Sequence, residues 1–220
     1  MNRRTLPAAA ALATAAALLL TACGGSDDGK SKNSGKIAGA DEGATKAASP
    51  SASASAGDAA GRPKISLPSD ISYTFDWPKT GDKDKDAILS DGEQSIKAVD
   101  MAIARQKSID PAYQFYYEGE AAAGTQTFIK QYIDAKVRTT GHYRFYQENV
   151  VVNKDGTASF GYCEDQGKAF VKHLKSGKVD RTPVDKDSYV SYNTALHKNK
   201  QGVWVIQKMF SQSGSAKCQP

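Results

Sequence analysis

Hydrophobic and polar positions divide the chain into three stretches. Residues 8–20 form an almost unbroken apolar run, whereas residues 24–63 contain no aromatic side chain and are rich in Ala, Ser and Gly. From residue 64 onward, apolar positions recur first at helical spacing and then at every second position. This pattern predicts a leader, a linker and one folded domain over 64–220, which is an ordinary domain length.

The first half of the domain carries the helical pattern. Residues 65–77 come first and are expected to be extended, because prolines interrupt them. A stripe of apolar residues that includes Ile88, Ile96 and Ile103 then predicts a helix over about 86–106. Asp110 followed by Pro111 predicts the cap and first residue of a short second helix. A third helix is expected from one apolar face, made by Phe128, Ile129, Tyr132, Ile133 and Val137.

The second half of the domain carries the strand pattern. After Gly141 the apolar period changes to two, and turn pairs such as Asp155-Gly156 and Ser176-Gly177 separate the runs. The predicted strands span 142–152, 157–164, 168–174, 178–181, 188–197 and 203–212. Helices followed by antiparallel hairpins predict an α+β fold, with the helices packed on one face of a sheet of about six strands.

The leader resembles that of a bacterial lipoprotein. Two arginines, at positions 3 and 4, precede the apolar run, which is shorter than the roughly 20 residues that span a bilayer. The run ends in Leu20-Thr21-Ala22-Cys23, which resembles a lipobox. The resemblance implies a signal peptide over 1–22, lipidation of Cys23 and anchoring on the extracytoplasmic face of the membrane. The alternative is an ordinary secretory signal that contains a cysteine.

The composition of the linker predicts whether it folds, and the net charge bears on whether the protein binds nucleic acid. Residues 23–63 have too few apolar side chains to offset the entropy of ordering them, so we expect a disordered linker there. The formal net charge is +5, and removal of the leader takes away Arg3 and Arg4 without removing any acidic residue. Because the remaining charge forms no dense basic stripe, we expect no nucleic-acid partner.

Two cysteines remain in the folded domain. Cys163 and Cys218 are an even pair in an oxidising compartment, which favours a disulfide. Such a bridge closes a loop of about 55 residues and contributes up to about 4 kcal/mol. The alternatives are two free thiols or a metal site. Since the three histidines are widely spaced and no CxxC or HExxH motif is present, we expect no metal and no cofactor.

The domain also resembles a known superfamily. The closing stretch 202–206, Gly-Val-Trp-Val-Ile, is similar to the last strand of NTF2-like proteins. Residues 161–168 and 189–193, together with Cys218, resemble uncharacterised actinobacterial lipoproteins of that type. The resemblance implies a cone in which a curved sheet wraps over helices. It leaves function open, because such cones serve isomerases, dehydratases, carriers and interaction modules.

A few residues are candidates for the lining of a pocket in the cone. Lys208 shares the parity of Trp204 and Ile206, so it either binds a carboxylate inside or extends to the rim. Tyrosines offer flat walls with a hydroxyl, although they are also common strand residues. His173 alternates with Val171 in a predicted strand and therefore joins the candidates. The other candidates are Tyr132, Tyr143 and Tyr192.

The sequence contains no recognisable catalytic set, since the GxSxG, P-loop and GxGxxG-helix motifs are absent. The main interpretation is therefore a non-enzymatic binding or interaction module, displayed outside the membrane, whose partner is an envelope protein or wall component. One alternative is a small-ligand carrier or sensor that uses the cone. The other is an enzyme of the isomerase or dehydratase type. A homodimer through the side of Val203, Val205 and Met209 is equally compatible with the pattern.

Overall fold

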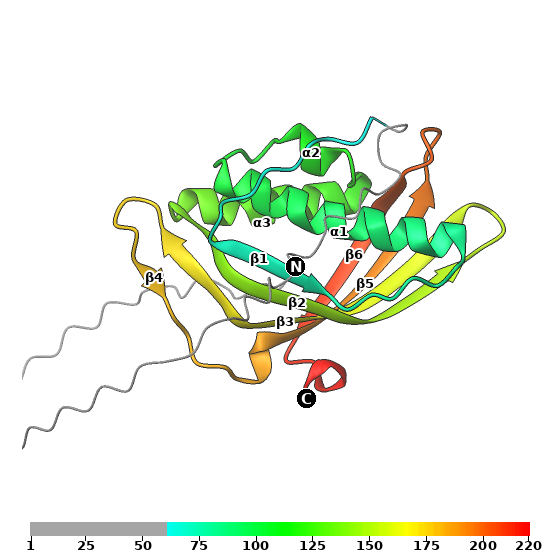
Figure 1. The fold of residues 1–220 in the computed structure, drawn as a ribbon. Coiled ribbons are helices and arrows are strands. Elements are labelled where there is room, and N and C mark those ends of the chain that lie inside the picture. The colour runs from blue at the N-terminus through cyan, green and yellow to red at the C-terminus, as the bar shows by residue number, and fades with distance from the viewer. Residues whose placement is uncertain (1–60) are drawn as a thin grey trace, which may run out of the picture. The chain divides into compact units, whose positions relative to one another are not determined.

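The structure is a computed structural model, and it describes residues 61–220. The predicted signal peptide (1–22), the lipidation site Cys23 and all but the last three residues of the predicted linker (23–63) lie outside the described residues. The described part contains three α-helices and six strands, in the order shown in Figure 1.

The helices follow the expected order, with sharper boundaries. α1 (Lys83–Ala104) begins three residues before its predicted start, because the Asp82 side chain accepts the N–H groups of Asp84 and Lys85. In α2 (Pro111–Gln114), the prediction that Asp110 is the cap is confirmed. α3 (Gly119–Asp134) ends before Val137, so the prediction that Val137 belongs to the helix is wrong.

Six strands form one sheet. They are β1 (Ile71–Phe75), β2 (Val137–Val152), β3 (Thr157–His173), β4 (Val179–Asp180), β5 (Tyr189–Lys198) and β6 (Trp204–Ser213). The order across the sheet is β1-β2-β3-β5-β6, and β4 pairs with β3. Only the β1–β2 pair is parallel within this sheet. The prediction of an α+β fold with six strands is confirmed, although the six include β1, from the extended segment before α1, and two of the predicted strands form the single strand β3.

Two strands are longer than predicted. β2 starts at Val137 and passes through Gly141, whose φ is +96°. β3 runs without a break through 165–167, where the sequence predicted a gap between two strands. The register with β2 shifts between His142 and Arg144, so the extra residues of β3 are absorbed as a bulge. A turn-like Asp-Gln-Gly sequence therefore bends one strand instead of separating two.

The helices cover one face of the curved sheet (Figure 1). α1 packs against β2 and α3 packs against β6, and we call the sheet face beneath them the inner face. The core between the two layers includes Ile88, Ile103, Ile129, Phe145 and Phe160, all at most 1% exposed. No helix within residues 61–220 has both the length and the apolar character that crossing a membrane requires.

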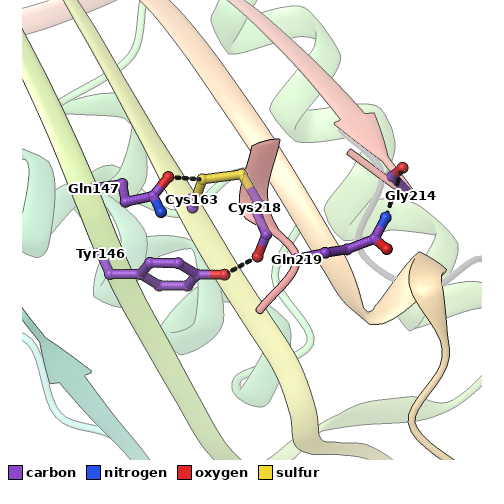
Figure 2. The surroundings of a disulfide bond; sticks show 6 residues. All are labelled: Tyr146, Gln147, Cys163, Gly214, Cys218 and Gln219. Atoms are coloured by element: carbon purple, nitrogen blue, oxygen red, sulfur yellow. Dashed lines mark hydrogen bonds between the residues drawn. A yellow bond between two sulfur atoms is a disulfide. The ribbon is translucent and has the colours of Figure 1, made fainter. Parts of the chain in front are cut away.

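The outer face of the sheet carries the disulfide. Cys163 of β3 is bonded to Cys218 in the short helical turn η3 (Ala216–Cys218), as predicted. Figure 2 shows that Tyr146 donates its hydroxyl hydrogen to the carbonyl of Cys218. Gln219 donates to the carbonyl of Gly214 at 3.3 Å. The disulfide and the Tyr146 hydrogen bond hold the C-terminal tail against β3 and β2 from the side opposite to the helices.

Candidate functional site

A carboxylate lies completely buried on the inner face of the sheet. Glu164 in β3 is 0% exposed. Its Oε2 accepts a hydrogen bond from the Tyr192 hydroxyl of β5 at 2.7 Å and another from Gln166 Nε2 at 3.0 Å. We call Glu164, Gln166 and Tyr192 the inner cluster. The three side chains come from two adjacent strands, so the sheet itself fixes their arrangement.

Aromatic rings border the inner cluster. The ring of Tyr162 stacks on that of Tyr192, with centroids 4.9 Å apart and planes 13° apart. Trp77 meets Tyr162 edge-on at 5.6 Å. Phe145 of β2 is the register partner of Glu164 and is fully buried. The carboxyl group therefore lies among large apolar surfaces, where its hydrogen bonds are stronger than they would be in water.

A second buried carboxylate faces the sheet from the helical layer. Asp100 of α1 is 0% exposed. It accepts the Tyr73 hydroxyl of β1 at 2.7 Å and the Thr139 hydroxyl of β2 at 3.1 Å. These two bonds connect α1 to the first two strands. Both layers of the domain thus place an acidic group at their interface, each held by hydroxyl donors.

The local sequence explains how Glu164 reaches the interior. Side chains alternate between the two faces of a strand, so Phe160, Tyr162 and Glu164 point the same way. Cys163 between them points to the outer face, where it bonds Cys218. The sequence analysis missed Glu164 because it ended the strand there and assigned the following residues to a turn. The parity with Phe160 and Tyr162 was the signal that identifies it.

The three tyrosine candidates lie at the helix–sheet interface. Tyr132 of α3, Tyr143 of β2 and Tyr192 of β5 are each at most 4% exposed. Tyr143 stacks against Tyr73 with a centroid separation of 5.9 Å, and Tyr132 packs against Phe128 of its own helix. Of the three, Tyr192 belongs to the inner cluster.

Lys208 does not share a face with Ile206, contrary to the expectation from parity. Ile206 pairs with Leu196, whereas Lys208 pairs with Ala195, so Gln207 is an extra residue in β6. This bulge reverses the facing of the residues that follow it, and Lys208 lies exposed on the outer side. It lines a pocket of about 460 Å³ with Phe210, which is 65% exposed. The remaining lining residues are Glu120, Asn193, Thr194, Ala195 and Met209.

His173 lies at the far end of β3 from the inner cluster. It is nine residues beyond Glu164, which corresponds to roughly 30 Å along an extended strand. Its Nε2 is 2.6 Å from Asp180 Oδ2, and both side chains are 40% exposed. Hydrogen bonds from His173 and then Lys178 lower the pKa of Asp180. The histidine therefore stabilises the β3–β4 hairpin and takes no part in the inner cluster.

No metal site accompanies these residues in the described range. Within residues 61–220, no three His, Cys, Asp or Glu side chains are grouped closely enough to hold a metal ion. The inner cluster instead offers one acidic acceptor and two neutral side chains, a phenol and an amide.

Comparisons with known proteins concern the fold. No protein-family model and no curated protein matches the chain. Among solved structures, a ketosteroid isomerase-like protein from Erwinia carotovora atroseptica is 15% identical, with a TM-score of 0.37 over 58% of this chain and 97% of that one. ActVI-ORFA from Streptomyces coelicolor is 10% identical, with a TM-score of 0.40 over 59% and 93%. An NTF2-like protein of unknown function from Shewanella oneidensis is 16% identical, with a TM-score of 0.31 over 56% and 96%.

Proposed function

We propose that the chain is a lipid-anchored, non-enzymatic binding module of the cell envelope, and that it takes a small ligand at the inner cluster. The observation that carries this proposal is the complete burial of Glu164 beneath Tyr192 and Gln166. Burial of a carboxylate carries a desolvation cost of several kcal/mol. An apolar side chain of similar volume at this place would carry no such desolvation cost. A polar group kept in such surroundings is a candidate for a functional role.

The lipid anchor supports display outside the membrane. The stretch 20–23 supplies the lipidation pattern, and residues 24–63 supply a spacer between Cys23 and the domain. We expect Cys23→Ser to leave the leader uncleaved or to release the protein from the membrane fraction. Fractionation followed by mass measurement of the N-terminus checks this. A Cys23→Ser protein that is processed normally and stays bound to membranes contradicts the anchor.

The pocket lined by Lys208 and Phe210, which we call the outer pocket, is a weaker candidate for small-ligand recognition. Its charged lining residues, Lys208 and Glu120, are both exposed, so water screens them and their side chains remain free to rotate. The inner cluster is already ordered by hydrogen bonds between neighbouring strands. Pre-ordered groups in a desolvated place bind with less loss of entropy, which favours the inner cluster.

Native mass spectrometry tests the proposal. The full chain, purified in detergent, is incubated with a small-molecule extract of its host, and retained mass is recorded. We expect the wild type to retain a small molecule and Glu164→Gln, which preserves the shape of the side chain, to lose it. Glu120→Gln in the outer pocket is the matched control and is expected to retain it. Retention by Glu164→Gln, or the absence of any retained molecule in the wild type, overturns the proposal.

A second candidate function is docking of another envelope protein at the outer face. It is favoured by Phe210, which is exposed beside Lys208 on the edge strand β6. The chemistry suits a segment that brings one apolar and one acidic side chain. A photoreactive phenylalanine analogue at position 210 tests this in intact cells. A crosslinked product that Lys208→Glu abolishes supports docking, and absence of any product contradicts it.

A further inference from the structure

We propose that one end of the domain docks on an anionic lipid surface. Three segments that are distant in sequence form this end: the loop 105–109 after α1, residues 135–136 before β2, and the tip 174–178 of the β3–β4 hairpin. We call them together the basic end. This surface is separate from the inner cluster and needs no small ligand.

Hydrogen bonds hold the three segments together. The side-chain amide of Gln106 donates to the carbonyl of Val137, the first residue of β2, at 3.1 Å. The backbone N–H of Leu174 donates to the carbonyl of Lys136 at 3.0 Å. The end of α1, the start of β2 and the β3–β4 hairpin therefore lie at the same end of the sheet.

The charge of the basic end is mostly of one sign. Its three segments contain five cationic side chains and no acidic one, and all five are exposed. These are Arg105, Lys107, Lys136, Lys175 and Lys178. Acidic neighbours offset only part of this charge, since Asp110 lies 3.6 Å from Arg105 and Asp180 lies 3.0 Å from Lys178. Asp134, which precedes the second segment, is paired with Lys130 of its own helix.

The opposite end of the sheet carries mixed charge. Figure 1 shows the β3–β4 hairpin at one end and the turn between β2 and β3 at the other. At that second end, Lys198 donates its backbone N–H to the carbonyl of Gly156 at 3.0 Å, and its Nζ lies 2.7 Å from Asp84. Asp and Lys alternate along residues 82–86 there. An anionic surface therefore attracts the basic end more strongly than the opposite end.

Two exposed aliphatic side chains favour lipid over a soluble polyanion. Leu174 is 42% exposed in the hairpin tip, directly before Lys175, and Ile109 is 62% exposed in the loop after α1. An anionic bilayer offers phosphate groups to the cations and, beneath them, an apolar layer to the aliphatic side chains. The long lysine side chains reach back to the headgroups while the aliphatic ones insert. A water-soluble anionic polymer offers charge alone.

Fluorescence quenching by lipid tests the docking. The full chain carries a fluorescent amino acid in place of Ser176, in the hairpin tip, and is mixed with vesicles that contain a spin-labelled lipid as quencher. The vesicles are made of phosphatidylcholine with or without phosphatidylglycerol. We expect stronger quenching with phosphatidylglycerol, and loss of this excess at high salt. The same label at Val151, which is 50% exposed near the opposite end, is the matched control and is expected to show no excess.

Variants separate the contribution of charge from that of insertion. Lys175→Gln combined with Lys178→Gln is expected to lose most of the excess quenching, whereas Lys154→Gln combined with Lys200→Gln at the opposite end retains it. Leu174→Ser is expected to reduce the excess, because the apolar contact is lost. Equal quenching at positions 176 and 151 overturns the docking proposal. An undiminished excess after Leu174→Ser also overturns it, since the surface then reads charge alone, as it would on a soluble polyanion.

Flotation keeps this test apart from that of the lipid anchor. Binding of the full chain to vesicles of phosphatidylcholine alone reports the anchor, because these vesicles carry no net charge for the basic end to recognise. A chain that fails to float with them contradicts the anchor. Excess quenching at position 176 in the anionic vesicles still supports the docking in that case.

Discussion

Arg62 holds Asp91 with two parallel hydrogen bonds across 29 residues of sequence. Nε and Nη2 of the guanidinium lie 2.8 and 3.1 Å from the two carboxylate oxygens. The Asp91 side chain is 0% exposed, and its Oδ2 also accepts the backbone N–H of Trp204 at 2.9 Å. This pair joins the first described residues to α1 and to the start of β6. Arg62 therefore takes part in the packing of the folded domain, two residues before the start that the sequence predicted.

Removal of Arg62 is expected to be costly. Arg62→Ala leaves a buried carboxylate without its charge partner, and we expect the free energy of unfolding to fall by about 3 kcal/mol. Arg144→Ala is the matched control, because its partner Asp76 is 42% exposed, and its cost is expected below about 1 kcal/mol. Urea unfolding followed by tryptophan fluorescence measures both. Equal losses of unfolding free energy in the two variants contradict the expectation that the buried Arg62–Asp91 pair stabilises the domain more than the exposed Arg144–Asp76 pair does.

Two glycines are expected to respond in opposite directions. Gly141 has a φ of +96°, and a Cβ there lies 2.3 Å from the carbonyl oxygen of Lys168. We expect Gly141→Ala to destabilise the domain by about 3 kcal/mol or to prevent folding. Gly124 lies within α3 and has open space around it, so Gly124→Ala is expected to stabilise by up to about 1 kcal/mol. Thermal melts of both variants check the prediction, and a shift of the same sign in both would count against it.

The disulfide is expected to resist alkylation and to contribute stability. Neither Cys163 nor Cys218 should react with iodoacetamide in the unreduced protein, whether native or unfolded in urea. The double change to Ser is expected to lower the free energy of unfolding by up to about 4 kcal/mol, because the bridge closes a 55-residue separation. Mass spectrometry counts the alkyl groups. Modification of either cysteine without reductant is the result that contradicts the bridge.

Acid is expected to weaken the ion pairs that Asp70 makes with Arg138 and Lys172. Hydrogen bonds from Arg138 and then Lys172 lower the pKa of Asp70 well below its usual range. A lowered pKa in the folded state stabilises the protein above the unfolded pKa of about 4, and this stabilisation is lost as the pH falls further. Asp70→Asn should therefore cost about 1 kcal/mol at pH 7, and progressively less below pH 4. Urea midpoints at pH 7, 4 and 2.5 measure this, and a difference independent of pH refutes it.

Sequence reasoning succeeded where local signals act over a few residues. The caps Asp82 and Asp110 lie next to the N–H groups that they satisfy, and Asp110-Pro111 identified the second helix in advance. The turn at Asp155-Gly156 likewise follows from the backbone preference of glycine, whose φ there is +81°. Such features depend on neighbours in the chain, and the rest of the protein changes them little.

The same reasoning failed where the pairing of strands decides the outcome. A bulge at Gln207 turned Lys208 and Phe210 outward, and another near Gly167 joined two predicted strands into one. Alternation along a strand predicts which face of the sheet each side chain takes only while the strand has no bulge. The extra residue of a bulge reverses the predicted face of the residues that follow it. Glu164 lies before the bulge and has the same parity as Phe160 and Tyr162, but the predicted strand ended at Glu164, so this residue was not named as a candidate.

The sequence alone determined the helix-then-strand order, the α+β class, the pair of cysteines available for a bridge, and the leader pattern on which the anchor proposal rests. Each of these depends on spacing and composition within a short stretch. Only the tertiary structure decided which acidic groups are buried, which face each strand residue takes, and that Glu164 and Tyr192 meet. Those outcomes depend on the hydrogen-bond register between strands that are distant in sequence. A shift of the register by one residue would move every side chain of a strand to the other face of the sheet.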